Sequence, residues 1–216
     1  HQKRLEKDRF DAFYDHLIVA DSRGDPSSLN HGVGVYRLLS AQKAKRAEGF
    51  YTAGEYDLSP ILRSGRPALE LGRSCVDGGF RGSNVMYLLW SHLAAYIKDR
   101  GIEVLFGVAS FHGTDINALA HPLSFLHHRH LAPEDLRVSA VPGAHQPMDL
   151  IAPDRVDRKR AMQMMPALIK AYLRLGGYVG EGAFVDHPFN TTDVCLVLDI
   201  RQIAPHHRAM YTGAAA

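Results

Sequence analysis

The chain has 216 residues, a length typical of one domain. Its 25 basic and 23 acidic residues give a formal net charge of +2, which is too even for a dedicated nucleic-acid-binding protein. Hydrophobic residues make up 46% of the chain and charged residues 22%, so the composition excludes an intrinsically disordered protein and predicts a folded globular one.

Six short aliphatic segments, each bounded by Gly, Pro, Asn or Asp, predict β-strands at residues 17–20, 33–39, 68–76, 104–111, 183–186 and 194–200. Residues 104–109 are apolar on both faces, which predicts a central strand covered by helices on each side. Ser83 is expected to cap a helix whose apolar residues recur every three or four positions up to Ile97. Pro166 suits the first position of another helix, which Gly176 ends.

This order of elements predicts an α/β fold, with a mixed central sheet flanked by helices in a single domain over residues 1–216. The last two strands are joined only by residues 187–193, a loop of hairpin length that favours antiparallel pairing. A purely parallel, doubly wound sheet therefore fits less well.

An acid and a base, Glu70 and Arg73, interrupt the apolar segment 68–76. Strict strand alternation points them to opposite faces, but Gly72 is a natural site for a β-bulge that turns both toward one cleft. One interpretation is a structural ion pair near a strand end. The other is a catalytic pair in that cleft.

Residues 80–84 join this strand to the following helix, and their backbone N–H groups are a candidate anion cradle. We assign Arg81, Gly82, Ser83 and Asn84 to the binding of a donor phosphate. A plain connecting turn is the alternative interpretation. The nucleotide-binding motifs GxGxxG and GxxxxGK[ST] are absent, which disfavours Rossmann and P-loop enzymes.

The thirteen histidines do not form a recognisable metal site, because His127, His128 and His130 lack an acidic or cysteine partner at ligand spacing. The same holds for His206 and His207. We therefore predict no metal and no cofactor. The two cysteines, Cys75 and Cys195, are too few for a disulfide-stabilised fold.

The longest stretch without Lys, Arg, Asp or Glu is residues 82–97, which is interrupted by polar residues and too short to predict a transmembrane helix. No signal peptide is visible, so we expect a cytoplasmic protein.

Two further clusters of polar residues have an ordinary and a functional interpretation. Basic residues gather at Lys43, Lys45 and Arg46 and again at residues 155–160, either as solvated helix faces or as a surface for an acidic carrier protein or anionic lipid. Residues 186–193 have the composition of a turn. Asp186 and Asp193 are alternatively carboxylates that bind an ammonium group.

Several segments together resemble the ornithine Nα-acyltransferases of bacterial ornithine-lipid synthesis, a hemolysin-like branch of the GNAT superfamily that is related in fold to acyl-homoserine-lactone synthases. The segments that carry the resemblance are FD (10–11), DHLIVAD (15–21), VYRLL (35–39), GFY (49–51), EYDL (55–58), ELGRSCV (70–76), LW (89–90), FGVASF (106–111), PALIKAYLRLG (166–176) and FNTTDVC (189–195).

The resemblance implies a GNAT-like domain that transfers a 3-hydroxy fatty acyl group from acyl carrier protein to the α-amine of ornithine and forms lyso-ornithine lipid. The expected catalytic residues are Glu70, as base, and Arg73, as the group that pairs with the substrate carboxylate. The residues assigned to acceptor binding are Asp15, His16, Asp186, Asn190 and Asp193.

The chain departs from the family pattern in two places. The family has an additional strand and helix before the segment that matches residues 8–21, so we expect this chain to lack them. The pyrophosphate loop of CoA-using GNAT enzymes is only partly matched by residues 79–84, which favours acyl carrier protein over acetyl-CoA as donor.

Three alternatives remain open at this stage. One is an acyl-homoserine-lactone synthase that uses S-adenosylmethionine, and another is a CoA-dependent N-acyltransferase. The third is a non-catalytic module that binds a carrier protein or a membrane surface. The expected partners are acyl carrier protein and ornithine, with peripheral contact at the inner face of the membrane and no nucleic acid.

Overall fold

The computed structural model describes residues 8–24 and 31–204. Its main sheet has eight strands, in the order β1–β2–β4–β5–β10–β9–β7, and β8 pairs with β10 off this path. The strands are β1 (Asp15–Ala20), β2 (Gly32–Ser40), β4 (Ala68–Val76), β5 (Val104–His112), β7 (His145–Gln146), β8 (Tyr178–Val179), β9 (Ala183–Asp186) and β10 (Thr191–Asp199). Among these described strands β4 and β5 are the parallel pair, and the other pairings are antiparallel. The sheet is therefore mixed, as the sequence predicts.

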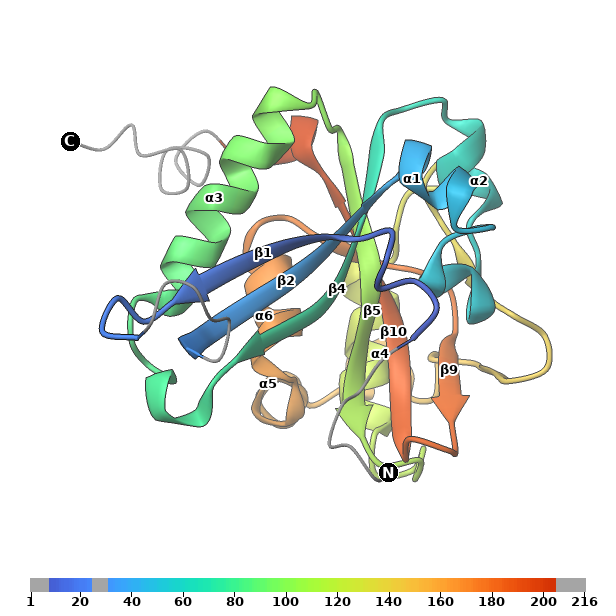
Figure 1. The fold of residues 1–216 in the computed structure, drawn as a ribbon. Coiled ribbons are helices and arrows are strands. Elements are labelled where there is room, and N and C mark those ends of the chain that lie inside the picture. Colours follow the sequence, from blue (N-terminus) through green and yellow to red (C-terminus); the bar gives the residue numbers. More distant parts are fainter. Residues whose placement is uncertain (1–7, 25–30, 205–216) are drawn as a thin grey trace.

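Helices cover both faces of this sheet (Figure 1). They are α1 (Ala41–Arg46), α2 (Ser59–Arg63), α3 (Val85–Asp99), α4 (Ala120–His130), α5 (Arg158–Met164) and α6 (Ala167–Arg174), with 3₁₀ turns η2 (Tyr51–Gly54), η3 (Gly78–Phe80), η4 (Pro153–Arg155) and η5 (Ile200–Gln202). A second small sheet pairs β3 (Tyr56–Asp57) with β6 (Ser139–Ala140).

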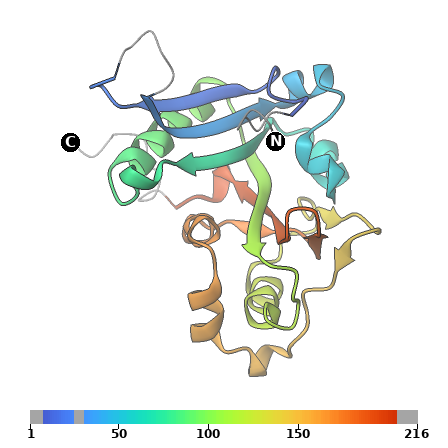
Figure 2. The ribbon, with the colours of Figure 1, turned by 60° about the horizontal axis from the view of Figure 1, so that its bottom comes forward.

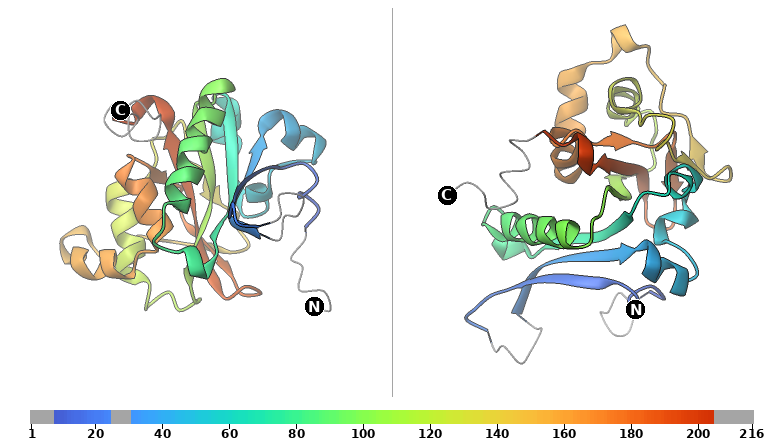
Figure 3. Two further views of the ribbon diagram at one scale, coloured as in Figure 1. Left: turned by 60° about the vertical axis from the view of Figure 1, so that its left-hand side comes forward. Right: turned by 90° about the horizontal axis from the view of Figure 1, so that it is seen from above.

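The two faces of the sheet bury separate hydrophobic clusters. Side chains of α3, α4 and α6 pack on one face, and those of α1, α2 and β3 pack on the other. Figure 3 shows α3 running along the sheet beside β1 and β2, with α4, α5 and α6 further along. Strand β5 contributes Leu105 to the first cluster and Phe106 to the second, which confirms the prediction of a central strand covered on both faces.

The six predicted strands all form, and β9 and β10 are antiparallel neighbours as the short connection implies. Helix α3 is confirmed, although Asn84 rather than Ser83 precedes its first residue. Pro166 lies one position earlier than expected, before the first residue of α6, and Gly176 follows that helix with a left-handed φ of 86°. Helix α4 was not predicted from the sequence; its first turn contains Pro122 and its last turn is rich in histidine.

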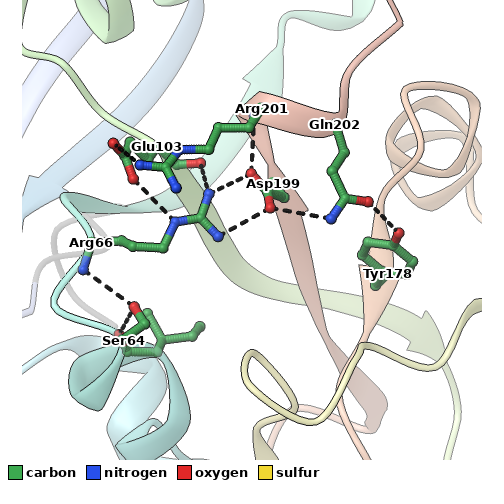
Figure 4. Close-up of polar contacts among 8 residues, drawn as sticks. Ser64, Arg66, Glu103, Tyr178, Asp199, Arg201 and Gln202 are labelled. Carbon is green, nitrogen blue, oxygen red and sulfur yellow. Dashed lines mark hydrogen bonds and ion pairs between the residues drawn. The ribbon is translucent and has the colours of Figure 1, made fainter.

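A network of charged side chains joins the ends of three central strands (Figure 4). Arg66, just before β4, donates to Glu103 at 3.1 Å and to Asp199 at 3.0 Å. Arg201 donates to the other oxygen of Glu103 at 2.6 Å, and Gln202 donates to Asp199 at 3.3 Å. These bonds fix the start of β4 and β5 against the end of β10.

No helix in the described part of the chain is long and apolar enough to cross a membrane.

We expect Arg66→Met to lower the free energy of unfolding by about 3 kcal/mol at pH 7, because it leaves the Asp199 side chain, which is 6% exposed, without its guanidinium partner. Burial raises the pKa of Asp199, but the hydrogen bonds from Arg66 and from the Arg201 backbone lower it below its ordinary value. A carboxyl group with a lowered pKa stabilises the fold at neutral pH, and this contribution is lost as the pH falls through that pKa.

The difference between wild type and variant should therefore shrink in acid, and urea unfolding at pH 7 and pH 3 measures it. The exposed Arg63→Met serves as the control. Equal losses of stability in the two variants would contradict the assignment.

Candidate active site

The central feature of the site is the place where β4 and β5 separate. The two strands pair only over Ala68–Glu70 and Val104–Phe106, and beyond this point β4 remains paired with β2 and β5 with β10. Gly107 lies at the branch, where an added Cβ would come within 2.2 Å of the Leu71 carbonyl oxygen. Figure 2 shows the two strands running in different directions beyond it. A glycine is required here because the two backbones approach so closely.

A β-bulge lies in β4 directly beside this branch. Cys75 pairs with Val35 and Gly72 pairs with Arg37, so that two β4 residues, Arg73 and Ser74, lie opposite a single residue of β2. The predicted bulge is confirmed, but the left-handed residue is Arg73, with φ of 45°, rather than Gly72. The bulge places Glu70 and Arg73 in the wall of one pocket.

Two cavities meet at the bulge from opposite faces of the sheet. The larger, which we call the polar pocket, has a volume of about 250 Å³. The smaller, of about 30 Å³, is lined on the other face by Tyr36 and by Leu168 and Tyr172 of α6. The two cavities share the lining residues Leu71, Gly72, Arg73 and Val108. The opening between β4 and β5 therefore has a polar chamber on one side and α6 on the other.

Glu70 lies in the wall of the polar pocket and is 1% exposed. Its carboxylate accepts hydrogen bonds from the Tyr14 hydroxyl at 2.6 Å and from the backbone N–H groups of Tyr51 at 3.1 Å and Thr52 at 2.6 Å. Three donors thus satisfy this buried charge without an arginine. Glu70 and Arg73 have separate partners instead of forming the structural ion pair of the first interpretation, since Arg73 contacts Asp8 at 3.3 Å.

A second arginine holds the N-terminal segment on the pocket. Arg37 of β2 is 4% exposed and forms ion pairs with Asp8, at 2.8 Å, and Asp11. Its guanidinium lies over the ring of Tyr14, 4.3 Å from the centroid. Arg37 therefore positions the residue whose hydroxyl binds Glu70.

Three carboxylates form an acidic group on the opposite wall of the pocket. Glu55 follows η2, Asp186 ends β9 and Asp193 lies in β10, and one oxygen of each lies within 4.8 Å of the others. Asp193 points to this side because it alternates with Cys195 and Val197, which pack in the same cluster. Burial, and then the charges of Asp193, Asp186 and Glu70, raise the pKa of Glu55 to about 8. Burial raises the pKa of Asp193, hydrogen bonds from Ser110 and Thr191 lower it, the charge of Asp186 raises it, and the net shift is upward.

The structure places four of the residues that the sequence analysis assigned, Glu70, Arg73, Asp186 and Asp193, in one pocket, together with Glu55 and Tyr14, which the sequence analysis did not assign. The signal for Glu55 was its place beside Tyr56 and Leu58, two apolar residues that are fully buried. A carboxylate in such a buried segment needs a hydrogen-bond or charge partner in the folded protein.

Three residues expected to bind the acceptor do not line the polar pocket. Asp15 shares the face of Leu17 and Val19 that α3 covers, and there it pairs with Lys43 and accepts from Tyr96 at 2.7 Å. His16 contacts the Asp11 carbonyl at 3.1 Å. Asn190 is the left-handed residue of the β9–β10 turn, with φ of 54°, so its ordinary interpretation as a turn residue holds.

Residues 81–84 are exposed and form the turn before α3, outside both cavities at the bulge. Gly82 has a left-handed φ of 83°, and the Ser83 hydroxyl donates to the Phe80 carbonyl at 2.6 Å. Ser83 also accepts from the Val85 N–H at 3.3 Å, so its hydroxyl bonds the first residue of α3 although Asn84 is the N-cap residue. The role of this turn in phosphate binding stays a prediction.

Two histidines of α4 take part in ordinary contacts, whereas the buried Nδ1 of His127 has no hydrogen-bond partner among the described residues. His128 bonds the Ile151 carbonyl at 2.8 Å, and the ring of His130 packs against Phe125. In the described part of the chain, Glu55, Asp186 and Asp193 form the group of side chains whose spacing suits a metal ion. His206 and His207 lie outside the described residues.

We expect Arg37→Met to release the N-terminal segment, because Asp8 and Asp11 lose their buried cation. Limited proteolysis should cut residues 8–14 faster in this variant than in wild type. Arg9→Met is the matched control, since Arg9 forms an exposed ion pair, at 3.9 Å, with Glu48 and lies over the ring of its neighbour Phe10. Equal cleavage rates in both variants would rule out the proposed role of Arg37.

The sequence matches an "Acetyltransferase (GNAT) domain" family model over residues 1–91. It is 54% identical to an L-ornithine N(alpha)-acyltransferase of Rhodobacter capsulatus, over 98% of this chain and 81% of that protein. The proteins of the same name from Brucella abortus and Agrobacterium fabrum are 44% and 39% identical, each over 99% of this chain and over 76% and 74% of their own length.

Solved structures similar to this one are more distant in sequence. A CoA-dependent acyl-homoserine lactone synthase aligns with a TM-score of 0.48 and 13% identity, over 98% of this chain and 70% of its own. An aminoglycoside 6'-N-acetyltransferase complexed with coenzyme A aligns with a TM-score of 0.44 and 10% identity, over 89% of this chain and 76% of its own.

Residues 1–91 of this fold carry the match to the GNAT acetyltransferase domain. At this identity over nearly its whole length, the chain belongs to the L-ornithine N(alpha)-acyltransferase family of N-acyltransferases.

Proposed function

We propose that this enzyme transfers a 3-hydroxy fatty acyl group from acyl carrier protein to the α-amine of ornithine and forms lyso-ornithine lipid. The names of its relatives support ornithine as the acceptor. The geometric observation that carries the proposal is the polar pocket at the separation of β4 and β5, which has both carboxylates and guanidiniums in its wall. An amino acid carries the opposite charges, so such a pocket suits it.

The proposed reaction needs few protein groups. The free amine attacks the thioester carbonyl, the C–N bond forms, and the C–S bond then breaks with its electron pair on the thiolate. Glu70 takes the proton that the amine loses, and that proton finally returns to the thiolate to give the free thiol.

Tyr14 supplies a route to Glu70. Its hydroxyl donates to the Glu70 carboxylate and lines the pocket, so it accepts the amine proton while passing its own proton to Glu70. A Cβ added to Gly72 would lie 3.8 Å from the Tyr14 oxygen, which puts this hydroxyl beside the bulge. The proton acceptor and the opening between the strands are therefore neighbours.

Arg73 and the bulge serve the other charges of the reaction. The planar guanidinium of Arg73 suits bidentate pairing with the acceptor carboxylate. Residues 73 and 74 lie outside the regular pairing with β2, so their backbone N–H groups are candidates to stabilise the oxyanion. Asp186 and Asp193 line the same pocket and are proposed acceptor-binding residues.

The acyl donor is assigned to the α6 side of the sheet. An apolar cavity of about 380 Å³ between α3, α6 and β10, lined by residues such as Leu93, Leu105 and Leu198, is suited to a hydrocarbon chain. A groove of about 410 Å³ on the same side contains His128, Arg129 and Arg158, beside the exposed basic residues of α5. Such a surface fits an acidic carrier protein. Arg81, Gly82, Ser83 and Asn84 are proposed to hold its phosphate.

The proposal places the reaction in the cytoplasm, where Cys75 and Cys195 stay reduced. We also propose that the enzyme contacts the inner membrane surface. Its product carries one acyl chain, and a single acyl chain binds a bilayer only reversibly.

We expect acyl carrier thioesters to react faster than the same acyl group on CoA. This preference should shrink as salt is added, because exposed charges are screened beyond about 8 Å at physiological ionic strength. Purified enzyme, ornithine and each donor are mixed at two salt concentrations, and the products are identified by mass spectrometry.

Equal, salt-independent rates would favour the CoA-dependent alternative. A lactone formed from S-adenosylmethionine would instead identify a lactone synthase. Binding of the carrier protein without release of free thiol, with any amine, would leave only the non-catalytic module.

Glu70→Gln and Arg73→Lys should affect different kinetic constants. Glutamine keeps the size of Glu70 and removes proton acceptance, so kcat should fall by about 10²- to 10⁴-fold with ornithine binding nearly intact. Lysine keeps the charge of Arg73 and loses its planar fork, so the KM for ornithine should rise. Steady-state kinetics and melting temperatures of both variants test this. Two poorly folded variants would indicate a structural role, and two stable, fully active variants would eliminate both assignments.

A further inference from the structure

The polar pocket contains more acid than base. Its charged lining residues are four carboxylates, from Glu55, Glu70, Asp186 and Asp193, and two guanidiniums, from Arg37 and Arg73. Arg37 is already paired with Asp8 and Asp11, and Glu70 is satisfied by Tyr14 and the η2 backbone. The acidic group of Glu55, Asp186 and Asp193 therefore lacks a cation of its own in the described part of the chain.

Two of these carboxylates are buried, and each has one oxygen without a hydrogen-bond partner. Glu55 is 8% exposed and Asp193 is 4% exposed. Oε2 of Glu55 and Oδ1 of Asp193 have no hydrogen-bond partner among the described residues, although both side chains line the pocket. Buried polar atoms are almost always satisfied in folded proteins, so these two indicate a ligand.

We propose that Glu55, Asp186 and Asp193 form a subsite for the side-chain ammonium of the amino-acid acceptor. This inference rests on the proposed function and names how the enzyme selects a diamino acid. Glu55 is the residue on which the subsite depends, because it is buried, keeps an unpartnered oxygen and lies beside the other two carboxylates. Burial, and then the charges of Asp193, Asp186 and Glu70, raise its pKa, and a cation bound to the group favours its charged form.

An ammonium group suits the chemistry of this pocket better than a metal ion. An ammonium has three N–H donors and no acceptor, which matches three carboxylates with oxygens inside a span of 4.8 Å. The rings of Tyr51 and Phe189 also line the pocket and offer apolar surface to a methylene chain. Arg73 lies in the same wall and is the proposed partner of the carboxylate of the same amino acid.

The test compares ornithine with norvaline, which has the same carbon chain and lacks the side-chain amine. Wild-type enzyme should prefer ornithine by about 10- to 100-fold in kcat/KM, the range expected for a hydrogen-bonded ammonium. Glu55→Gln and Asp193→Asn should remove most of this preference through a higher KM for ornithine, with a smaller change in norvaline kinetics. Glu134→Gln, at an exposed glutamate outside the pocket, should keep the wild-type ratio.

Calorimetry measures the binding of the two amino acids without any acyl donor, so it tests the subsite independently of activity. Ornithine should bind wild type more tightly than norvaline, and Glu55→Gln should reduce the difference. If wild-type enzyme acylates neither amino acid, the proposed function fails. If it acylates both and the variants lower both rates equally, only the subsite is wrong.

A divalent cation is the competing occupant. Wild type and Glu55→Gln are therefore heated with Mg²⁺, Ca²⁺ or Mn²⁺ after treatment with EDTA. No shift in melting temperature, and an unchanged rate in EDTA, are expected for an ammonium subsite. A metal-dependent shift that Glu55→Gln abolishes, together with loss of activity in EDTA, would overturn the proposal in favour of a metal site.

Discussion

The close approach of Gly107 to the Leu71 carbonyl fixes where this sheet opens. Parallel pairing between β4 and β5 stops after Glu70, and from there each strand follows its other neighbour. A continuous sheet would fill this space with backbone hydrogen bonds. The opening instead exposes a stretch of β4 to both faces, and the bulge at Arg73 turns side chains of opposite charge into the same chamber. Both cavities at the bulge depend on this single interruption.

The buried carboxylates of the polar pocket fall into two kinds. Glu70 has three hydrogen-bond donors from Tyr14 and η2, so its charge is stabilised by the protein alone. Glu55 and Asp193 each keep an unpartnered oxygen, and burial raises the pKa of both. Buried oxygens without a hydrogen-bond partner cost stability, and proteins keep them mainly at functional sites such as pockets. In the proposed function Glu70 is the carboxylate that takes part in the reaction, and Glu55 and Asp193 are carboxylates that bind the ligand.

The sequence predicted the elements whose signal is local. Strands β4, β5 and β10 are long apolar segments, and α3 has a clear helical repeat, so each could be predicted from its own residues. Helix α4 has no such repeat, and its histidines obscure the apolar face that it packs on the sheet. The bulge was also predictable, because a charged pair around a glycine in an apolar strand has few other solutions.

The composition of the pocket was harder to predict because it depends on distant contacts. Tyr14 lies 56 residues from Glu70, and Glu55 reaches Asp193 from the other end of the chain. Asp15 was misassigned for a related reason, since only the packing of α3 decides which face of β1 is covered. A local sequence pattern indicates that a buried charge needs a partner, and the tertiary fold determines which residue that partner is.

One short segment connects the two sides of the pocket. Residues of η2 donate two backbone N–H groups to Glu70, and Glu55 follows directly at the end of that turn. The next residue, Tyr56, is fully buried and donates its hydroxyl to the backbone carbonyl of Asp193 at 2.9 Å. The same stretch therefore orients the Glu70 carboxylate and holds Glu55 against β10. A displacement of this segment would move Glu70 and the acidic group together, so the proposed proton acceptor and the proposed ammonium subsite share six residues of backbone, 51–56.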